Sequence, residues 1–551
     1  MKNLLLVFIL LFFAKSGTAQ WNTDTLIRNQ LSIVNANFDP RILEDGNGGY
    51  FVGWISGSLA GPIAFAMQRV DSAGFSLWQQ NGLTIIPASV LNFADYEQIA
   101  LCPGDSTDVF IVWVNSASDD RLFIQRLNEN GDTLFGGNGK QFDLSFSGAQ
   151  MDDVKIITDG SGGIITCTKI GSFTIDDRII LQKVDRSGNT HYPNLNYIGP
   201  TNISAIWSSV PDGNGGGFCL YEENNKNQLI HFDSTGTESW PVPLVFESRG
   251  IDDTSQAMVK DPVSNGCFIA YLDSGDAISL QYIDTTGSPR WSGTGIQVSG
   301  SQEWFFHPTV AADYNGGAFV GYSMRYNSDP DSMFYIVKHY DSNGVQTIGS
   351  DSLVILMPSA AFRFTLTADK NGGAYVAWEE YRYGRICIFS QYYSSNGIKN
   401  WRQDGYPVIT AANQFDQVPC PASCNALSHQ IIDAGSTGLV VTWADNRTSR
   451  LNFAVYAAKV DGAINTDIDY LSPTNSEYLF IYPIPAQEKV FLKLPASGMF
   501  VTVIDLMGKT IARLQSDKLE MEIDLSTVNP GVYFIEAADY HQKLRSKFIR
   551  N

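Results

Sequence analysis

Histidines and carboxylates are considered first, because most acid–base and metal-assisted chemistry depends on them. The six histidines show no paired spacing of the kind that metal sites use. No serine stands in a Gly-x-Ser-x-Gly elbow between a strand and a helix. Adjacent carboxylates such as Asp152 and Asp153 would point to opposite faces of an extended strand. The sequence therefore predicts no catalytic residues and no metal ligands.

Seven cysteines are present, an odd number that forbids complete pairing. Cys420 and Cys424 lie close together in Cys-Pro-Ala-Ser-Cys, and in an oxidising compartment we expect a local disulfide there. A metal site is less favoured, because no second cysteine pair or histidine pair accompanies them. Cys167, Cys219 and Cys267 fall within short apolar stretches, where we expect them to be buried as small hydrophobic residues.

A recurring Asp-x-Asn-Gly-Gly phrase could suggest calcium, because its side chains carry oxygen ligands. A calcium loop of the EF type needs more acidic residues and a distant glutamate. One aspartate and one asparagine or serine favour a hairpin turn instead, in which the aspartate accepts backbone hydrogen bonds and glycine supplies positive φ. We therefore expect no cofactor, and weak calcium binding remains open.

Two polar hairpin tips could form a ligand-binding face, because each combines a tryptophan with an acid and an arginine. These residues are Trp378, Glu380 and Arg382 in one tip, and Trp443, Asp445 and Arg447 in the other. Aromatic and polar groups on one face suit a sugar or a peptide. The alternative is that acid and arginine pair across each turn, a surface ion pair worth about 0–1 kcal/mol.

The elements that would position these residues come from an internal repeat. The phrase Asp45-Gly46-Asn47-Gly48-Gly49 has further copies that begin at Asp159, Asp212, Asp313 and Asp369, and degenerate copies near Gly104, Asp261 and Asp433. A second phrase, Gln-x-x-Asp-x-x-Gly, follows each first one. Its glycines run from Gly74 to Gly462, which is 388 residues over seven intervals, or about 55 per repeat.

Each repeat reads as four short strands joined by tight turns, such as those predicted at Pro40–Glu44, Tyr50–Trp54 and Leu83–Ile86. Four antiparallel strands at this period are typical of a propeller blade. We therefore predict an all-β chain with an eight-bladed β-propeller; seven blades is the alternative. The last repeat lacks a fourth strand, which the orphan segment Asn29–Val34 could supply to close the ring.

Charge argues against one class of partner. The chain carries 37 basic and 57 acidic residues, a net charge of −20, and shows no basic patch. A nucleic-acid backbone attracts basic surfaces, so we expect no nucleic-acid partner.

The N-terminus predicts export. A lysine at position 2 precedes the apolar run Leu4–Ala14, and small residues Gly17-Thr18-Ala19 follow. This run is too short to span a bilayer, which takes roughly 20 residues. We expect a cleaved signal peptide over residues 1–19 and no transmembrane segment in the mature chain.

The repeat ends near residues 472–476, a linker rich in turn-forming residues, and residues 477–551 then alternate in the manner of strands. We expect residues 20–471 to form the propeller and the tail to form a small Ig-like β-sandwich. The tail's motifs are Tyr482, Pro483 and Pro485, then Asp505 and Gly508, then Pro530, Gly531 and Tyr533.

In that order, these motifs resemble the type A C-terminal sorting domain of the type IX secretion system of Bacteroidota. The resemblance implies that the secretion machinery is a partner and that the protein is secreted or held at the outer-membrane surface. It also implies that the tail is removed after export.

From these observations we expect a binding or adhesion scaffold without catalysis of its own, with a surface glycan or a protein as ligand. The alternative is a hydrolase or lyase that acts on polysaccharide from a propeller scaffold, with acids drawn from separate blades.

Overall fold

The computed structural model describes residues 21, 29–33, 37–57, 62–91, 98–104, 107–115, 120–142, 148, 150–172, 175–192, 196–246, 256–300, 304–326, 329–348, 357–358, 364–382, 385–395, 397–401, 405–409, 429–435, 438–445, 453–461, 480–482, 486–494, 497–505, 509–538 and 543–550. Its named elements are all β-strands. The chain divides into two compact units, Met1–Ile464 and Asn465–Asn551. The predicted signal peptide lies outside the described residues.

The first unit contains, within its described ranges, eight four-stranded antiparallel sheets. The first four sheets are β2(Asn37–Glu44) β3(Tyr50–Gly57) β4(Ile63–Val70) β5(Leu83–Leu91); β6(Ile99–Pro103) β7(Val109–Asn115) β8(Arg121–Leu127) β9(Lys140–Gln141); β10(Gln150–Thr158) β11(Ile164–Ser172) β12(Ile175–Val184) β13(Asn196–Ile198); and β14(Ala205–Pro211) β15(Gly217–Glu223) β16(Lys226–Phe232) β17(Leu244–Phe246). Each sheet corresponds to one copy of the sequence repeat.

The remaining four sheets continue in chain order. They are β18(Gln256–Lys260) β19(Cys267–Leu272) β20(Ile278–Ile283) β21(Ile296–Gln297); β22(Trp304–Ala312) β23(Ala318–Tyr326) β24(Asp329–Tyr340) β25(Met357–Pro358); β26(Phe364–Ala368) β27(Ala374–Arg382) β28(Arg385–Tyr393) β29(Tyr406–Ile409); and β30(Gln430–Asp433) β31(Gly438–Asp445) β32(Ala454–Asp461) with β1(Asn29–Gln30).

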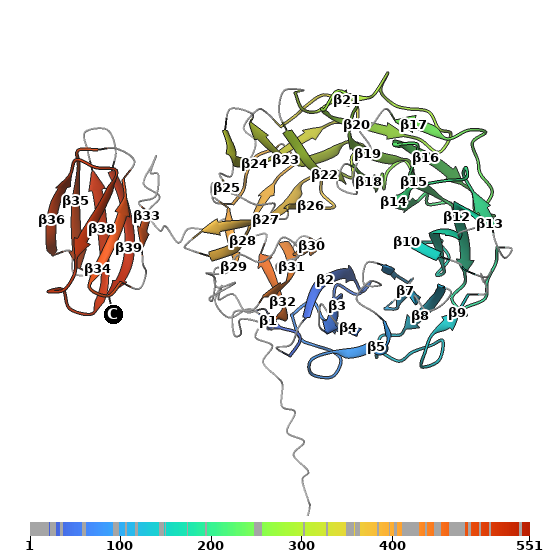
Figure 1. The fold of residues 1–551 in the computed structure, drawn as a ribbon, viewed down its shortest axis with the longest axis horizontal. Helices are drawn as coiled ribbons and strands as arrows, with labels where there is room; N and C mark the ends of the chain where they lie inside the picture. Colours follow the sequence, from blue (N-terminus) through green and yellow to red (C-terminus); the bar gives the residue numbers. More distant parts are fainter. Residues whose placement is uncertain are drawn as a thin grey trace, which may run out of the picture. The chain divides into compact units, whose positions relative to one another are not determined.

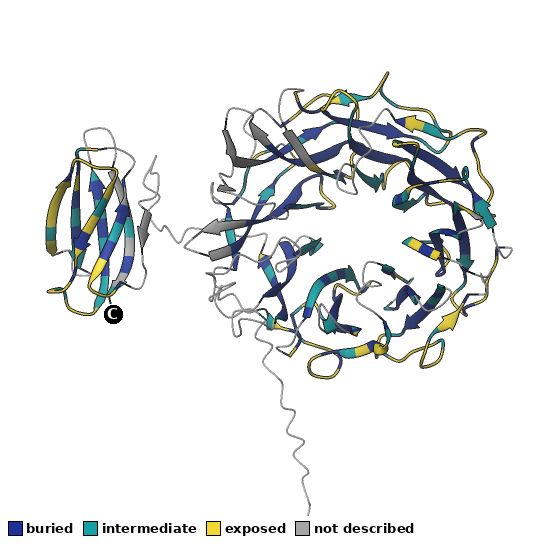
Figure 2. Cartoon of the chain, viewed as in Figure 1, coloured by how far each residue is buried: buried dark blue, intermediate teal, exposed yellow. Residues whose placement is uncertain are grey.

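The eight sheets form a closed ring (Figure 1). The first strand of each sheet lies on the inner side of the ring and contacts the first strand of the next, and β30 contacts β2. Eight apolar clusters fill the spaces between neighbouring sheets, one of them between the eighth and the first. Burial accordingly runs through the middle strands of every sheet (Figure 2).

The N-terminal segment completes the eighth sheet, which confirms the predicted strand donation. Asn29 and Gln30 pair with Ala457 and Tyr456 of β32, and the Leu31 N–H donates to the Val455 carbonyl at 2.8 Å. The eighth sheet therefore has four strands like the others, and the edge of β32 is covered by β1.

Trp21 also contributes to the junction of the eighth and first sheets. Its indole Nε1–H donates to the Ser72 carbonyl at 2.8 Å, two residues before the turn glycine Gly74. Trp78 makes the equivalent bond from the first sheet to Glu129 of the second at 2.9 Å, and Trp240 makes it from the fourth sheet to the fifth at 3.0 Å. Trp21 thus supplies for the eighth sheet a contact that other repeats carry within themselves.

The second unit has two sheets, β33(Phe480–Tyr482) β34(Lys489–Lys493) β37(Glu520–Asp524), and β36(Thr510–Ser516) β35(Met499–Asp505) β38(Gly531–Ala538) β39(Lys543–Arg550). Both contribute to one apolar core, for example through Leu492 of β34 and Val503 of β35. Alternating residues of β35 and β38 point into this core, as the sequence predicted.

Candidate functional site

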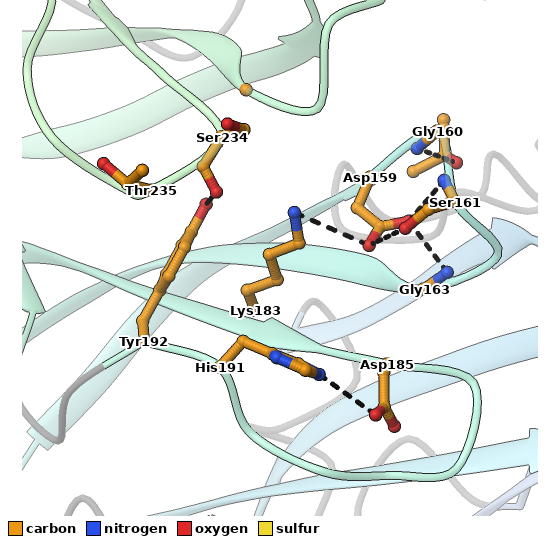
Figure 3. A network of polar contacts seen from close by, with 12 residues as sticks. Asp159, Gly160, Ser161, Gly163, Lys183, Asp185, His191, Tyr192, Ser234 and Thr235 are labelled. Carbon is orange, nitrogen blue, oxygen red and sulfur yellow. Dashed lines mark hydrogen bonds and ion pairs between the residues drawn. The ribbon is translucent and has the colours of Figure 1, made fainter.

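The turn between the first and second strands is built on a buried aspartate. In the third sheet, Asp159 Oδ1 accepts the backbone N–H groups of Ser161 and Gly163, both at 2.8 Å (Figure 3). The turn at Asp45 is the same, with Asn47 N–H and Gly49 N–H both at 2.8 Å. The aspartate therefore satisfies backbone donors that the tight turn would otherwise leave unpaired. The predicted hairpin turn is confirmed.

The second carboxylate oxygen binds a partner from elsewhere in the same sheet. Six sheets have such a pair: Asp45 with Arg69, Asp159 with Lys183 and Ser161, Asp212 with His231, Asp261 with Ser264 and Arg290, Asp313 with His339, and Asp369 with Tyr392. In the second sheet the buried acid is Asp108, at the other end of the turn, and it pairs with Arg126. The strongest pairs measure 2.7–3.0 Å between heavy atoms. A buried carboxylate needs such partners, because burial without them is costly.

The eighth sheet has no aspartate at this turn position. Its turn begins at Ala434, whose N–H donates to the Gly438 carbonyl, and Asp433 is the last residue of β30, the position that Glu44 holds in β2. Asp433 is 5% exposed, and neither of its carboxylate oxygens has a hydrogen-bonding partner within the part of the chain that the structure describes. The position that supplies the cation in the first sheet is Arg69, which pairs with Phe51 across β3 and β4. Its counterpart is Lys459, which pairs with Val440, and no ion pair joins it to Asp433 in the described part of the chain. Among the described residues, the Asp433 carboxylate is thus buried without an ion pair.

This environment changes the acidity of Asp433. Burial raises its pKa to about 6, and the charges of Asp369 and Glu44 add to the rise. Lys370 and the N–H of Gly435 lower the pKa, although that N–H does not reach hydrogen-bonding geometry. Asp433 therefore titrates close to neutral pH instead of staying fully ionised.

Lys370 and Glu44 form an ion pair near Asp433. The Lys370 Nζ lies 3.3 Å from Glu44 Oε1, and these side chains are 54% and 45% exposed. Lys370 belongs to the first turn of the seventh sheet, and Glu44 is the last residue of β2 in the first. The pair thus joins two sheets that flank the eighth.

Tyr314 brings an exposed aromatic ring to the same place. It lies in the first turn of the sixth sheet, is 38% exposed, and has φ +61°. Gly46, Gly160 and Gly213 hold this position in three other turns, with φ between +71° and +79°. The charges of Lys370, Glu44 and Asp433 all act on its phenol, whose pKa is raised mainly by burial. A bulky residue in this backbone conformation is strained and is a reason to look for a function.

Glu44, Tyr314, Lys370 and Asp433 are called the first-turn cluster below. They come from four consecutive sheets of the ring, the sixth, seventh, eighth and first, and all lie at or next to the turn after the first strand. The cluster combines an exposed aromatic, an exposed ion pair and an unpaired buried acid, which is the composition of a polar binding surface.

The ligand face predicted from the sequence does not include the first-turn cluster, and the prediction was wrong for its two tryptophans. Trp378 and Trp443 have no exposed surface and pack in the cores between sheets. Asp445 is 1% exposed and accepts a hydrogen bond from the Trp443 indole at 2.7 Å. A buried ring cannot stack on an external ligand, so these three side chains are removed from that face. Glu380 and Arg382 lie in β27 without a described side chain, and Arg447 is outside the described residues.

One of the two cysteine predictions is confirmed, and the other lies outside the described residues. Cys167, Cys219 and Cys267 are fully buried and free, as predicted. Cys420 and Cys424 are outside the described residues, so their disulfide remains a prediction.

In the second unit, Tyr533 is the best-defined motif residue. Its hydroxyl donates to the Asn529 carbonyl at 2.8 Å, and its ring stacks on Phe548 with centroids 5.6 Å apart. Pro530 and Gly531 lie in the turn it spans and at the start of β38. Asp505 Oδ1 accepts the Lys509 N–H at 2.9 Å. Tyr482 ends β33, while Pro483, Pro485 and Gly508 are outside the described residues.

The comparison with protein families identifies this unit. Residues 480–551 match the family model described as "Secretion system C-terminal sorting domain". Residues 480–551 are a sorting domain. The resemblance to the type IX sorting domain is thereby confirmed over these residues. A sorting domain implies export, contact with the secretion machinery, and a cell-surface or secreted location.

The rest of the chain has less specific likenesses. No curated protein matches the chain in sequence. Among solved structures, it is similar to PorZ, a surface component of the type IX secretion system of Porphyromonas gingivalis, at 11% identity over 94% of this chain and 82% of that chain, with a TM-score of 0.26. It is also similar to the BP39L lectin from Burkholderia pseudomallei, at 12% identity over 69% and 100%, with a TM-score of 0.39.

A third likeness is to prolyl oligopeptidase B from Galerina marginata, at 10% identity over 75% of this chain and 55% of that chain, with a TM-score of 0.41. Values this low assign no activity. Within the described ranges, no helix is long and apolar enough to cross a membrane.

Proposed function

We propose that the protein is an exported eight-bladed β-propeller that binds a ligand at its first-turn cluster. A signal peptide over residues 1–19 would carry it across the inner membrane, and the type IX sorting domain would take it across the outer membrane. The propeller would span residues 20–471, the linker 472–476 and an Ig-like sandwich 477–551. The ring of eight sheets with its closed set of inter-sheet cores supports the blade count.

The observation that supports binding is Tyr314. A tyrosine at φ +61° costs about 1–2 kcal/mol where glycine would cost nothing, and the ring remains 38% exposed. Strain at an exposed aromatic beside the Lys370–Glu44 pair is explained if the ring contacts a ligand. The ligand class on this evidence is a surface glycan or a protein.

The test is a binding screen on the purified secreted protein. A glycan array and a capture assay with envelope proteins should give a ligand whose affinity falls about tenfold in the Tyr314→Gly variant, because the ring would be lost while the turn is relaxed. A ligand that binds the variant and the wild type equally would place binding elsewhere.

A polysaccharide-acting hydrolase or lyase is the second candidate function. It is supported by Asp433, whose pKa of about 6 suits a general acid, near the exposed carboxylate of Glu44. Release of reducing ends from a panel of acidic and neutral polysaccharides, lost in both Asp433→Asn and Glu44→Gln, would establish it. Release that persists in both variants would exclude these residues as the catalytic acids.

A further inference from the structure

The sorting domain has one edge strand that lacks the features by which proteins usually prevent edge-to-edge pairing. β36 is the outermost strand of its four-stranded sheet, and within the described residues no strand pairs with its outer side. All of its seven residues except Ser516 are exposed or half-buried (Figure 2). Its register against β35 shifts once, at Ile511, and is regular from Ala512 to Ser516. This regular segment leaves backbone N–H and C=O groups open to another strand.

The other edge strands of the same domain are protected. β33 has only three residues, and β39 has four basic residues among eight. β37 carries acids at alternate positions, Glu520, Glu522 and Asp524. Short strands and repeated charges both prevent a sheet edge from pairing with another chain. β36 has a single charged residue, Arg513, and contains neither proline nor glycine.

The ring offers no comparable edge on its outer side. In seven of its eight sheets the outermost strand has two to four residues. The exception, β5, has nine residues but contains Pro87, and its register against β4 shifts twice. Proline within a strand removes a backbone donor and disrupts pairing. An incoming strand is therefore matched better by β36 than by the outer strands of the ring.

Exposed apolar side chains gather around β36. The large hydrophobic residues that the described part of the sorting domain exposes are Phe500, Ile511, Leu514 and Leu519. Ile511 and Leu514 belong to β36, and Leu519 follows it in the chain. Phe500 of β35 pairs directly with Gln515 of β36. Exposed apolar residues that cluster in this way mark an interaction site more often than scattered ones do.

Arg513 adds a charge to this edge. Its guanidinium carbon lies 5.9 Å from the centroid of the Phe500 ring, and it forms no ion pair among the described residues. A strand that pairs with β36 would gain stability from an acid opposite Arg513 and from apolar side chains beside it, because such cross-strand pairs are favourable. β36 itself contains no acid, so a second copy of this strand could not supply one.

We propose that β36 is the strand through which the sorting domain docks on the secretion machinery, by pairing with a strand of the machinery that carries an acidic residue opposite Arg513. The occupant follows from the family match, because a sorting domain contacts the secretion machinery. The open backbone edge, the exposed apolar side chains and Arg513 together form the surface for that contact. This inference concerns export and does not depend on the ligand site of the ring.

The experiment measures export of the full chain in the bacterium that produces it, as the fraction found outside the cell. We expect Arg513→Glu to lower this fraction about tenfold, because the substitution turns attraction into repulsion across the strand pair. Arg513→Lys keeps the charge and should be exported like the wild type. The double variant Ile511→Lys/Leu514→Lys should also be retained, because lysines on an edge oppose strand addition.

Lys518→Glu is the matched control. It makes the same change of charge in an exposed residue two positions beyond the end of β36, where no strand edge is available. We expect normal export of this variant. Normal export of Arg513→Glu, or an equal loss in Lys518→Glu, would overturn the proposal. Urea unfolding of each purified full-length variant shows whether its sorting domain is still folded.

A crosslinking experiment decides the question even if one of these variants unfolds. Replacing Ile511 by a photoreactive phenylalanine analogue should give an adduct with a component of the secretion machinery, at a strand that carries an acid. Replacing that acid by lysine should restore export of Arg513→Glu. An adduct between two copies of this chain would show that β36 pairs with itself, and the assignment to the machinery would be wrong. Absence of an adduct, or of the rescue, would also contradict it.

Discussion

Asp313 and Asp433 are both buried acids, Asp313 in a first turn and Asp433 at the end of the first strand of its sheet, and they should contribute to stability with opposite sign. Burial alone would raise the pKa of Asp313, but hydrogen bonds from His339 and from two backbone N–H groups lower it overall. Asp433 has no such bonds to any described residue, and burial raises its pKa to about 6. Both carboxylates are buried, so the partners of each carboxylate decide whether the folded state prefers the ion or the acid.

The pH dependence of Asp433 follows from this sign. Because the folded pKa lies above the ordinary value, the folded state binds the proton more tightly, and this residue's contribution to stability falls as the pH rises from about 4 to about 6. Asp433→Asn should therefore raise the free energy of unfolding by about 1–2 kcal/mol at pH 7.5. Urea unfolding at pH 7.5 and pH 4.5 checks this, and a gain that does not shrink at the lower pH would contradict it.

Asp313→Asn tests the opposite sign at a buried acid with partners. A lowered pKa stabilises the fold above the unfolded value, and the contribution is lost as the pH falls through the folded pKa. The substitution also leaves buried His339 without its carboxylate at 2.9 Å. We expect a loss of about 3 kcal/mol at pH 7.5, measured by the same urea titrations; no loss would mean that this pair is not stabilising.

Tyr314 permits a second test at the level of one residue. Tyr314→Gly should stabilise the protein by about 1 kcal/mol, because glycine accepts positive φ without a steric cost. Gly160→Ala makes the reverse change at φ +71°, where an added Cβ meets no atom within 4 Å. It should destabilise by a similar amount, and thermal melting of both variants checks the pair. If both substitutions changed the stability in the same direction, the proposed backbone strain at Tyr314 would be contradicted.

Sequence reasoning found the turns but not the cluster. Asp-x-Asn-Gly-Gly predicted the Asx turns correctly, and the tyrosine in place of glycine at position 314 was a visible signal. The aromatic residues Trp378 and Trp443 were predicted to face a ligand, which was wrong because both are buried. Recurrence of that aromatic in most copies indicates a core position, because every inter-sheet space must be filled. Convergence of four turns depends on ring closure, which no local pattern encodes.

The junction of the eighth and first sheets is where we expect a single substitution to destabilise the ring most easily. It rests on a two-residue strand and on Trp21, which is 8% exposed and packs with Tyr50. Trp21→Ala should cost about 3 kcal/mol, in the range of buried aromatic deletions. It should also free the edge of β32 and make the protein associate, which urea unfolding and size-exclusion chromatography measure together.

Trp78→Ala is the control for that variant. It removes an equivalent indole and its bond to Glu129 between two sheets that the chain itself connects. We expect a similar loss of stability but a monomer, because no strand edge is released. Association of both variants to the same extent would show that loss of packing, and not the open edge, causes it.

The strands themselves were largely predictable. Short runs of β-branched and aromatic residues between glycine-containing turns fixed their positions in every repeat, and the missing fourth strand of the last repeat pointed to Asn29–Gln30. Trp21 was missed, because its role appears only when its indole bond is compared with those of Trp78 and Trp240.

For the molecule as a whole, the two compact units suggest separate tasks. The sorting domain has its own core, and the ring is closed without it. Removal of residues 477–551 should therefore leave a folded ring that is not exported and stays in the periplasm. Cell fractionation with a protease-resistance assay checks both parts, and the truncated protein outside the cell would contradict the role of the tail.

Removal of the tail after export is a separate prediction. The secreted or surface protein should end near residues 472–477, because the sorting domain has no further role once export is complete. Mass spectrometry of the protein outside the cell decides this, and an intact Asn551 terminus there would contradict it. Phe548→Asp, which places a charge in the core of the tail, should block export without altering the ring.

The two-residue length of β1 also sets where the ring opens during native-state fluctuations. Each of the other outermost strands is joined to its sheet by a covalent turn, whereas β1 reaches β32 only through side-chain and backbone hydrogen bonds from a distant part of the chain. Local unfolding free energy should therefore be lowest at this seam. In hydrogen exchange, amides of β32 that face β1 should exchange before those at equivalent positions of β4, β8 and β16. Local unfolding would then be concentrated at the junction of the eighth and first sheets.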